Sequence, residues 1–172
     1  MHRGVDGAWT RALIERMRER VPGVVLRTTM IVGHPGEGSR EFNELLKFVR
    51  EARFPRLGAF MYSEEEGTYG AENLKDSVRP STKKRRLDTL MEAQRGISLA
   101  YNQSRVGTEE KVLADSISDG VLVCRSEFES PEVDGEILVK APEGMDAASL
   151  VGTFFNVRIT AADEYDLIAE II

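Results

Sequence analysis

Residues 24–37 have the sequence VVLRTTMIVGHPGE, and this stretch decides the expected fold of the first half of the chain. It begins with a β-branched, largely apolar run that is typical of a strand buried on both faces, and it ends in a loop rich in glycine. Ser39 is a good N-cap, and apolar residues follow it at helical spacing, at Phe42, Leu45, Leu46 and Val49. A second buried strand is expected at 57–62. This order of strand, loop, helix and strand predicts a βαβ unit of a parallel sheet.

The segments around this unit predict two more helices and a long loop. A helix is expected at 10–20, with an apolar face of Leu13, Ile14, Met17 and Val21. Residues 63–80 have no period, and a loop of that length usually carries function or links domains. Ser81 is expected to cap a helix that reaches about residue 104.

The first turns of this last helix are basic, with the run Lys83, Lys84, Arg85 and Arg86. Positive charge at a helix N-terminus opposes the helix dipole, so something other than local helix energetics is expected to hold it. A partner or an acidic neighbouring surface would do so. The alternatives are a contact with RNA and a plainly solvated helix face.

After Gly107 the sequence changes to short strand-like runs separated by Gly, Asp and Pro. The runs lie at 111–114, 120–125, 135–139, 152–159 and 165–172. Five short strands in so few residues predict a small antiparallel barrel of the OB type. The expected fold class is therefore α/β followed by all-β.

The net charge of −6 hides an asymmetry between the two halves. Residues 1–105 carry 19 Lys and Arg against 14 Asp and Glu, a balance of +5, whereas residues 106–172 carry 4 against 15, a balance of −11. Such a step usually marks a domain boundary, and the two halves are expected to face different partners.

Composition excludes several classes of protein. The apolar runs are too short for a membrane helix, and the start of the sequence lacks the pattern of a signal peptide. The single cysteine, Cys124, excludes an internal disulfide and a cysteine-cluster metal site, and it is interpreted as a core residue. His2 and His34 lack metal-ligand spacing, and no nucleophile elbow is present. The cytoplasm is the expected compartment.

The strongest chemical signal is the loop after the first strand. In a parallel α/β sheet, ligands bind at the carboxyl ends of the strands, where this loop lies. Gly33 and Gly36 would let the backbone approach a ligand closely, and Glu37 places a carboxylate before the next helix. The second strand end, from Tyr62 into an acidic run at 64–66, is expected on the same rim. The alternatives are a plain strand-to-helix turn and a solvated acidic loop.

Four motifs resemble those of one enzyme family. They are LRTTMIVGHPGE at 26–37, FVREAR at 48–53, GAFMYSEEEGT at 58–68 and SPEVDG at 130–135. In this order they resemble the radical S-adenosylmethionine methylthiotransferases. The last motif is similar to the TRAM barrel of the RimO-type branch, which modifies the twelfth small-subunit ribosomal protein.

The resemblance implies a fold and a division of the chain. Residues 1–80 would be the C-terminal part of a partial TIM-type radical S-adenosylmethionine barrel, 81–105 a bridging helix, and 106–172 a five-stranded, OB-like TRAM barrel. The family holds its 4Fe-4S clusters on cysteines of an N-terminal domain and of a Cys-x-x-x-Cys-x-x-Cys loop. Cys124 matches neither, so the chain is expected to be the C-terminal portion of such an enzyme, without cluster ligands or catalytic residues and inactive alone. Residues 1–4 resemble an internal stretch of the family.

The resemblance also implies a reaction and a cofactor site. The reaction would be radical methylthiolation of an aspartate side chain, with S-adenosylmethionine as cofactor. Gly33 and Glu37 match the motif beside the adenosyl group, and Phe60, Tyr62 and Ser63 lie at the next strand end. Arg3 would reach a carboxylate of the cofactor or substrate. His34 is interpreted as a packing residue.

The acidic barrel bears on the substrate. Gripping RNA phosphates requires clustered Lys and Arg, and the balance of −11 opposes this, so a basic ribosomal protein is the expected partner and transfer RNA a less favoured one. The missing N-terminal domains would be a second partner. The alternatives are that the acidic residues only confer solubility, that the enzyme modifies transfer RNA adenosine, and that the chain is a non-catalytic substrate-binding module.

Overall fold

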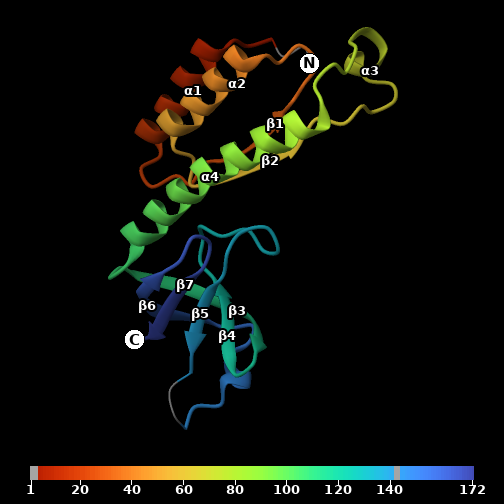
Figure 1. Ribbon diagram of the computed structural model, residues 1–172. Helices are drawn as coiled ribbons and strands as arrows, with labels where there is room; N and C mark the ends of the chain where they lie inside the picture. The colour runs from red at the N-terminus through yellow and green to blue at the C-terminus, as the bar shows by residue number, and fades with distance from the viewer. Residues whose placement is uncertain (1–3, 142–143) are drawn as a thin grey trace. The chain divides into compact units, whose positions relative to one another are not determined.

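The computed structural model describes residues 4–141 and 144–172, which form two compact units, Met1–Ile97 and Ser98–Ile172 (Figure 1). The first unit contains the helices α1 (Gly7–Arg20), α2 (Ser39–Ala52) and α3 (Tyr69–Asn73), the strands β1 (Arg27–Val32) and β2 (Arg56–Met61), and most of α4 (Pro80–Arg105). The second contains β3 (Glu109–Ser118), β4 (Val121–Arg125), β5 (Ile137–Lys140), β6 (Phe154–Ala162), β7 (Leu167–Ile171) and a short 3-10 helix, η1 (Ala147–Leu150).

The βαβ prediction is confirmed in the first unit. β1 and β2 are parallel, with Arg27 opposite Arg56 and Val32 opposite Met61, and α2 connects them. Helices α1, α2 and α4 supply Ile14, Val49 and Leu90 to a core that also takes in Val32 and Leu57.

The expectation that both strands are buried on both faces is wrong for the described residues. Alternate residues of β1 point away from the helices, and Ile31 is 42% exposed. Phe60 of β2 is 64% exposed. β1 and β2 pair only with each other in the described part of the chain, and Ile31 and Phe60 leave one face of this two-stranded sheet exposed. The apolar run therefore predicts the strand correctly but not its surroundings.

The helices differ from expectation at their starts and in the loop at 63–80, and α1 begins at Gly7, three residues before the expected start. Gly38, and not Ser39, is the N-cap of α2, because the carboxylate of Glu41 accepts the Gly38 N–H at 2.9 Å. α4 begins at Pro80, one residue before the expected cap Ser81, which agrees with the preference of proline for the first helical turn. The loop expected to lack structure contains the short helix α3, capped by Thr68.

In α1, Ile14 is buried as expected, but Met17 and Val21 are exposed by 41% and 54%. The apolar stripe thus extends beyond the part of the helix that packs on the core.

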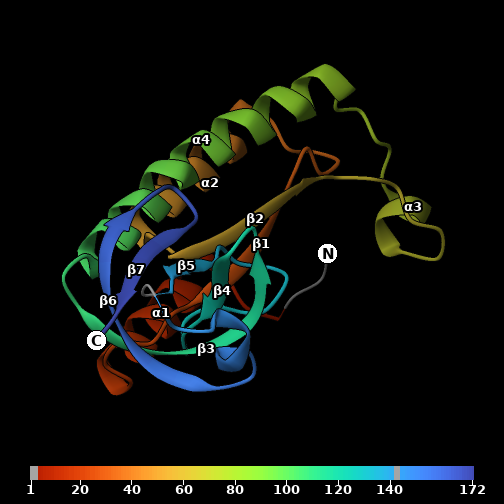
Figure 2. The same cartoon turned by 90° about the horizontal axis from the view of Figure 1, so that it is seen from below.

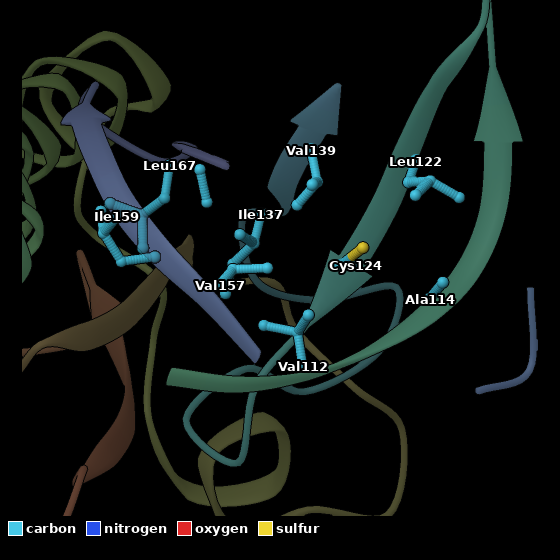
Figure 3. Packing of buried hydrophobic residues seen from close by; sticks show 10 residues of the cluster. Val112, Ala114, Leu122, Cys124, Ile137, Val139, Val157, Ile159 and Leu167 are labelled. Carbon is cyan, nitrogen blue, oxygen red and sulfur yellow. The ribbon is translucent and has the colours of Figure 1, made fainter. Parts of the chain in front are cut away.

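The five-stranded barrel is confirmed and closes in the order β3-β4-β5-β7-β6. Its strands are antiparallel except for β5 and β7, which are parallel, so the prediction of a purely antiparallel barrel is corrected at that pair. Ten buried residues fill the interior, including Val112, Leu122, Cys124 and Ile137, and Figure 3 shows these side chains pointing toward one another. Cys124 is a core residue, as predicted.

Figure 2, which shows the molecule from below, shows α4 as one continuous helix. Among the described residues, none of the helices combines the length and apolar character that crossing a membrane would need.

Candidate functional site

The loop after β1 is held by a buried ion pair that the sequence did not reveal. Arg86 of α4 donates from Nη1 to both the backbone O (2.9 Å) and the Oε1 (2.8 Å) of Glu37. The same Oε1 accepts the backbone N–H of Gly33 at 2.9 Å. The side chains of Arg86 and Glu37 are only 8% and 10% exposed. Glu37 therefore ties the two ends of the loop to the start of α4.

The end of β2 is held in a similar way by Lys83. Its Nζ donates to the backbone O of Tyr62 at 2.9 Å and to Oδ2 of Asp76 at 2.5 Å. The ammonium also lies 5.0 Å from the centre of the Tyr62 ring. The hydrogen bond from Lys83 lowers the pKa of Asp76, and the positive charge of Lys83 acts in the same direction, so the Asp76 carboxyl is ionised at neutral pH.

Two glycines of the loop adopt positive φ, but for different reasons. At Gly33 (φ +76°) a Cβ would collide with the side-chain methylenes of Lys83. At Gly36 (φ +87°) nothing lies within 4 Å of such an atom. The close approach expected at Gly33 is thus made by Lys83 of the chain itself, whereas Gly36 is required by backbone conformation.

The solvated-face interpretation of the basic run is wrong for two of its four residues. Lys83 and Arg86 are 6% and 7% exposed and pair with carboxylates, which confirms the expectation of an acidic neighbouring surface. Lys84 and Arg85 are exposed, and Lys84 pairs with Asp88 of its own helix. Lys83 and Arg86 are buried together because residues three apart lie on the same face of a helix, whereas Lys84 and Arg85 lie on another face.

The structure brings together only some of the predicted site residues. Gly33, Glu37 and Tyr62 meet through α4, and the Tyr62 N–H donates to the O of Val32 at 2.8 Å. His34 packs edge-on against Tyr62, with ring centres 5.1 Å apart, in agreement with a packing role. The hydroxyl of Tyr62 is buried and has no hydrogen-bond partner among the described residues.

The other predicted residues lie apart from this arrangement. Phe60 is exposed on the sheet face, and Ser63 donates to Glu65 at 3.0 Å in the acidic loop. Arg3, with His2, lies outside the described residues.

An open pocket of about 450 Å³ borders the loop on the side of the α2 and α4 N-termini. It is lined by Gly36, Glu37, Gly38, Arg79, Thr82 and Arg86, with other residues of the 77–79 segment. The sequence reasoning missed Lys83, Arg86 and Asp76 as parts of the site. One signal in the sequence could have revealed the two basic residues. Positive charge at a helix N-terminus opposes the helix dipole, so basic residues there need carboxylate partners.

In the parts that the structure describes, 4–141 and 144–172, no group of three or more His, Cys, Asp or Glu side chains is arranged to hold a metal ion. Burial in the barrel, together with the charge of Asp115, raises the pKa of Cys124 to about 12. A single buried thiol also cannot supply the several cysteine thiolates that hold an iron–sulfur cluster.

The second unit contains its own buried ion cluster at the C-terminal end of α4. Arg105 donates to Glu110 (2.6 Å), to Glu129 and to Ser126 (3.2 Å). Burial alone would raise the pKa of Glu129, but the hydrogen bond and charge of Arg105 and two hydrogen bonds from Ser126 outweigh it, so that pKa is lowered. This cluster joins the helix to the connection between β4 and β5.

The SPEVDG motif lies in that connection. A Cβ on Gly135 would collide with the backbone carbonyl of Tyr165, and the Glu136 N–H donates to Asp166 at 2.9 Å. Asn102 of α4 donates to the carbonyls of Asp163 (3.0 Å) and Tyr165 (3.1 Å). The β4–β5 connection and the β6–β7 turn therefore pack as one structure, with Val133 69% exposed.

The few basic residues of the barrel are largely engaged within it. Arg125 pairs with Asp115 at 3.1 Å and Arg158 with Glu109 at 2.8 Å. The Lys111 ammonium lies 5.0 Å from the ring centre of Phe154. Residues 126–136 and 163–166 contain only acidic charges. The charge of these two segments is therefore entirely negative.

Comparison with known proteins finds related sequences over the whole chain. Residues 106–172 match the model of the TRAM domain. Over all 172 residues the chain is 49% identical to a protein of Bacteroides fragilis named ribosomal protein uS12 methylthiotransferase RimO. The chain is thus similar, along its whole length, to the C-terminal portion of RimO proteins.

Two further relatives carry the same name, one from Porphyromonas gingivalis at 46% identity and one from Cytophaga hutchinsonii at 45%. Each match covers all of this chain, which spans about 39% of the length of the first two RimO relatives and 38% of the third. The matched part is their C-terminal portion. Among solved structures, the apo form of Mycoplasma genitalium RNase R aligns with 64% of this chain and 20% of its own, with a TM-score of 0.33 and 12% identity, which supports no argument.

Proposed function

We propose that this chain is the C-terminal portion of an enzyme that methylthiolates an aspartate of ribosomal protein uS12 by radical S-adenosylmethionine chemistry. The observation that carries the proposal is the 49% identity, over every residue of the chain, to a RimO protein named for that substrate. In this proposal residues 1–80 belong to the α/β barrel of the enzyme, 81–105 form the bridging helix, and 106–172 form the TRAM barrel. An enzyme acting on a ribosomal protein would work in the cytoplasm.

The residues of this chain do not fit the iron–sulfur cluster that the family implies. Its one cysteine is buried in the barrel core with a raised pKa, and the described residues offer no other ligand group. We therefore assign the cluster to the part of the enzyme that this chain does not span. The chain alone is not expected to catalyse the reaction.

For S-adenosylmethionine, which would supply the radical and the methyl group, this chain offers binding residues only. Gly33 and Glu37 would lie beside the adenosyl group, with Phe60, Tyr62 and Ser63 at the neighbouring strand end. The Tyr62 hydroxyl is buried and finds no partner within residues 4–141 and 144–172, which supports a polar ligand near that end, because such a group usually has a partner. Arg3 is proposed to reach a carboxylate of the cofactor or substrate.

The TRAM barrel is proposed to dock the basic protein substrate. Its balance of −11 attracts a polycation, and its basic residues are largely paired with its own carboxylates or with an aromatic ring. Binding of this kind weakens as salt rises, because exposed charges are screened. Transfer RNA would face the same negative field and bind less well.

The activity is tested by joining the chain to the N-terminal portion of the Bacteroides fragilis relative and expressing this joined enzyme with uS12. Mass spectrometry should find a methylthio group on one aspartate of uS12 and no new modification on transfer RNA adenosine. The N-terminal portion without this chain is the control and should leave uS12 unmodified. Modification of transfer RNA, with uS12 unchanged, would contradict the proposal and favour the alternative enzyme.

The docking role is tested separately with the 172-residue chain. Calorimetric titration with uS12 and with transfer RNA, at low and high salt, should show salt-sensitive binding of the protein and weaker binding of the RNA. Tighter binding of transfer RNA at matched salt would overturn the docking role. Failure of both ligands to bind would leave the barrel without a recognition role.

A further inference from the structure

The first turns of α4 carry two basic side chains that are buried and point inward. Lys83 and Arg86 are 6% and 7% exposed, although long cationic side chains are rarely buried unless they are paired. They lie three residues apart and therefore share one face of the helix. Their neighbours Lys84 and Arg85 are exposed, so burial is specific to that face.

Arg86 fixes the loop after β1 at both of its ends. Its Nη1 reaches the O and the Oε1 of Glu37, and Oε1 in turn accepts the N–H of Gly33, 2.9 Å away. The guanidinium also lies 5.5 Å from the ring centre of Phe42 in α2. Because the pair is buried, removing Arg86 would leave the Glu37 carboxylate without its charge partner, and the loop would have to open to hydrate it.

Lys83 fixes the end of β2 and touches the first loop as well. Its Nζ bonds the carbonyl of Tyr62 and the carboxylate of Asp76, while its methylenes occupy the space where a side chain of Gly33 would lie. One lysine thus spans both strand ends. A shift of α4 would move the two loops together.

We propose that Lys83 and Arg86 are positioning residues of the cofactor site, which fix the backbone of the loops at 33–37 and 62–63. This rests on the proposed function only in assigning S-adenosylmethionine to those loops. The two residues do not touch the cofactor; they act through Glu37, Gly33 and Tyr62. A cofactor site built on loops binds its ligand well only if the backbone of those loops is held in place by its neighbours, so such a site requires this support.

The same arrangement explains why basic residues occupy an unfavourable place in the helix. A cation near a helix N-terminus is repelled by the positive end of the helix dipole. The carboxylates of Glu37 and Asp76, which lie on other segments, offset that repulsion in this fold. We call Lys83 and Arg86, together with the Asp76 and Glu37 carboxylates that they bind, the clamp. Of the four basic residues at the start of α4, Lys84 and Arg85 are surface charges.

Amide hydrogen exchange on the 172-residue chain tests the clamp directly. In Arg86→Gln the Gly33 amide should exchange about tenfold faster relative to the amides of Val49 and Leu90, because its acceptor is no longer held. Lys83→Met keeps the packed methylenes but loses the ammonium, and should act in the same way on the segment at Tyr62. The double variant Lys84→Gln/Arg85→Gln removes two charges from the same turn and should change neither site.

Three results would overturn the clamp. They are an unchanged Gly33 amide in Arg86→Gln, an equal rise at all amides, which indicates only global destabilisation, and the same local effect in the exposed double variant. Glu37→Gln/Arg86→Gln provides a further check, since an amide at position 37 still accepts the Gly33 N–H without a buried charge. In this double variant the Gly33 amide should exchange at a rate closer to that of the unchanged chain than in Arg86→Gln alone.

The joined enzyme gives the catalytic readout. Arg86→Gln should raise KM for S-adenosylmethionine about tenfold while kcat changes by less than about twofold, and Arg86→Lys should fall between it and the unchanged enzyme. A loss of kcat with KM unchanged would contradict positioning of the cofactor. If the unchanged joined enzyme is inactive, the proposed function fails, whereas the exchange experiment still decides the clamp.

Discussion

The two units of this chain form their sheets in opposite ways. The five strands of the barrel close on themselves and leave no open edge, around a core of ten buried residues. The two strands of the α/β unit pair with each other, and Ile31 and Phe60 remain exposed on the face away from the helices. A closed sheet satisfies its own backbone, whereas an isolated pair of strands depends on what packs against it. The difference teaches that the barrel is complete as a fold, while the α/β unit has a sheet face suited to a further layer.

The largest expected effect is that of Arg105→Ala, which should destabilise the barrel and leave the stability of the α/β unit unchanged. Arg105→Ala would leave the carboxylates of Glu110 and Glu129 buried without their partner, at a cost of about 3–5 kcal/mol. Amide exchange of β4 and β5 should report this loss. The fluorescence of Trp9, the single tryptophan, should show the α/β unit unfolding as before.

Arg158→Ala is the matched control, because its pairs with Glu109 and Glu170 are exposed. It should destabilise the barrel far less than Arg105→Ala does, because exposed ion pairs contribute little to stability. An equal loss in both variants would mean that burial of the Arg105 cluster does not contribute as argued.

The second effect concerns the packing of the two barrel connections. Gly135→Ala would place a methyl group against the Tyr165 carbonyl and should destabilise the barrel by about 1–3 kcal/mol. Gly96→Ala, in open space on α4, should instead stabilise the helix by about 1 kcal/mol. Urea unfolding followed by circular dichroism measures both. A neutral Gly135→Ala would show that the connections move apart easily.

The third effect is a dependence of barrel stability on acid pH. The pKa of Glu129 is lowered in the folded state, so its contribution is fully present above its unfolded pKa of about 4.3 and is lost as pH falls through the folded value. Unfolding of the barrel between neutral pH and pH 3 should therefore become easier in the acid range. Glu129→Gln should flatten that part of the profile, and an unaltered profile would assign the acid sensitivity to other groups.

The smallest effect is expected on the open sheet face. Phe60 is 64% exposed, so Phe60→Ala should change the stability of the α/β unit by less than about 0.5 kcal/mol. Leu90→Ala, in the core of the same unit, should cost about 2–5 kcal/mol. Trp9 fluorescence during urea unfolding measures both. A large cost for Phe60→Ala would show that this face is covered in solution and would weaken the contrast between the units.

The fold could be predicted from sequence where periodicity is strong. The βαβ unit, the long helix and the five strands of the barrel follow from alternation and helical spacing, because these patterns reflect local geometry. The cap of α2 at Gly38 and the parallel pairing of β5 with β7 could not be predicted in this way. The first depends on the hydrogen bond that the Gly38 N–H donates to Glu41, and the second on which strands become neighbours when the barrel closes.

The candidate site could be predicted only as a set of loops. The sequence places Gly33, Glu37 and Tyr62 at the ends of neighbouring strands, and the structure has them there. It does not show that Glu37 is bound to Arg86, 49 residues later, because partners so distant in sequence leave no local pattern. The cofactor roles of Phe60, Ser63 and Arg3 remain predictions.

The sequence by itself determined the order of elements, the charge step between the halves and the family resemblance, because these depend on residue identity and spacing alone. Only the tertiary structure decided which charges are surface charges. Lys83 and Arg86 are indistinguishable in sequence from Lys84 and Arg85, yet two are buried against carboxylates and two are exposed. The physical reason is that the burial of a charge depends on the partner that folding brings to it, and Glu37 and Asp76 come from other segments of the chain.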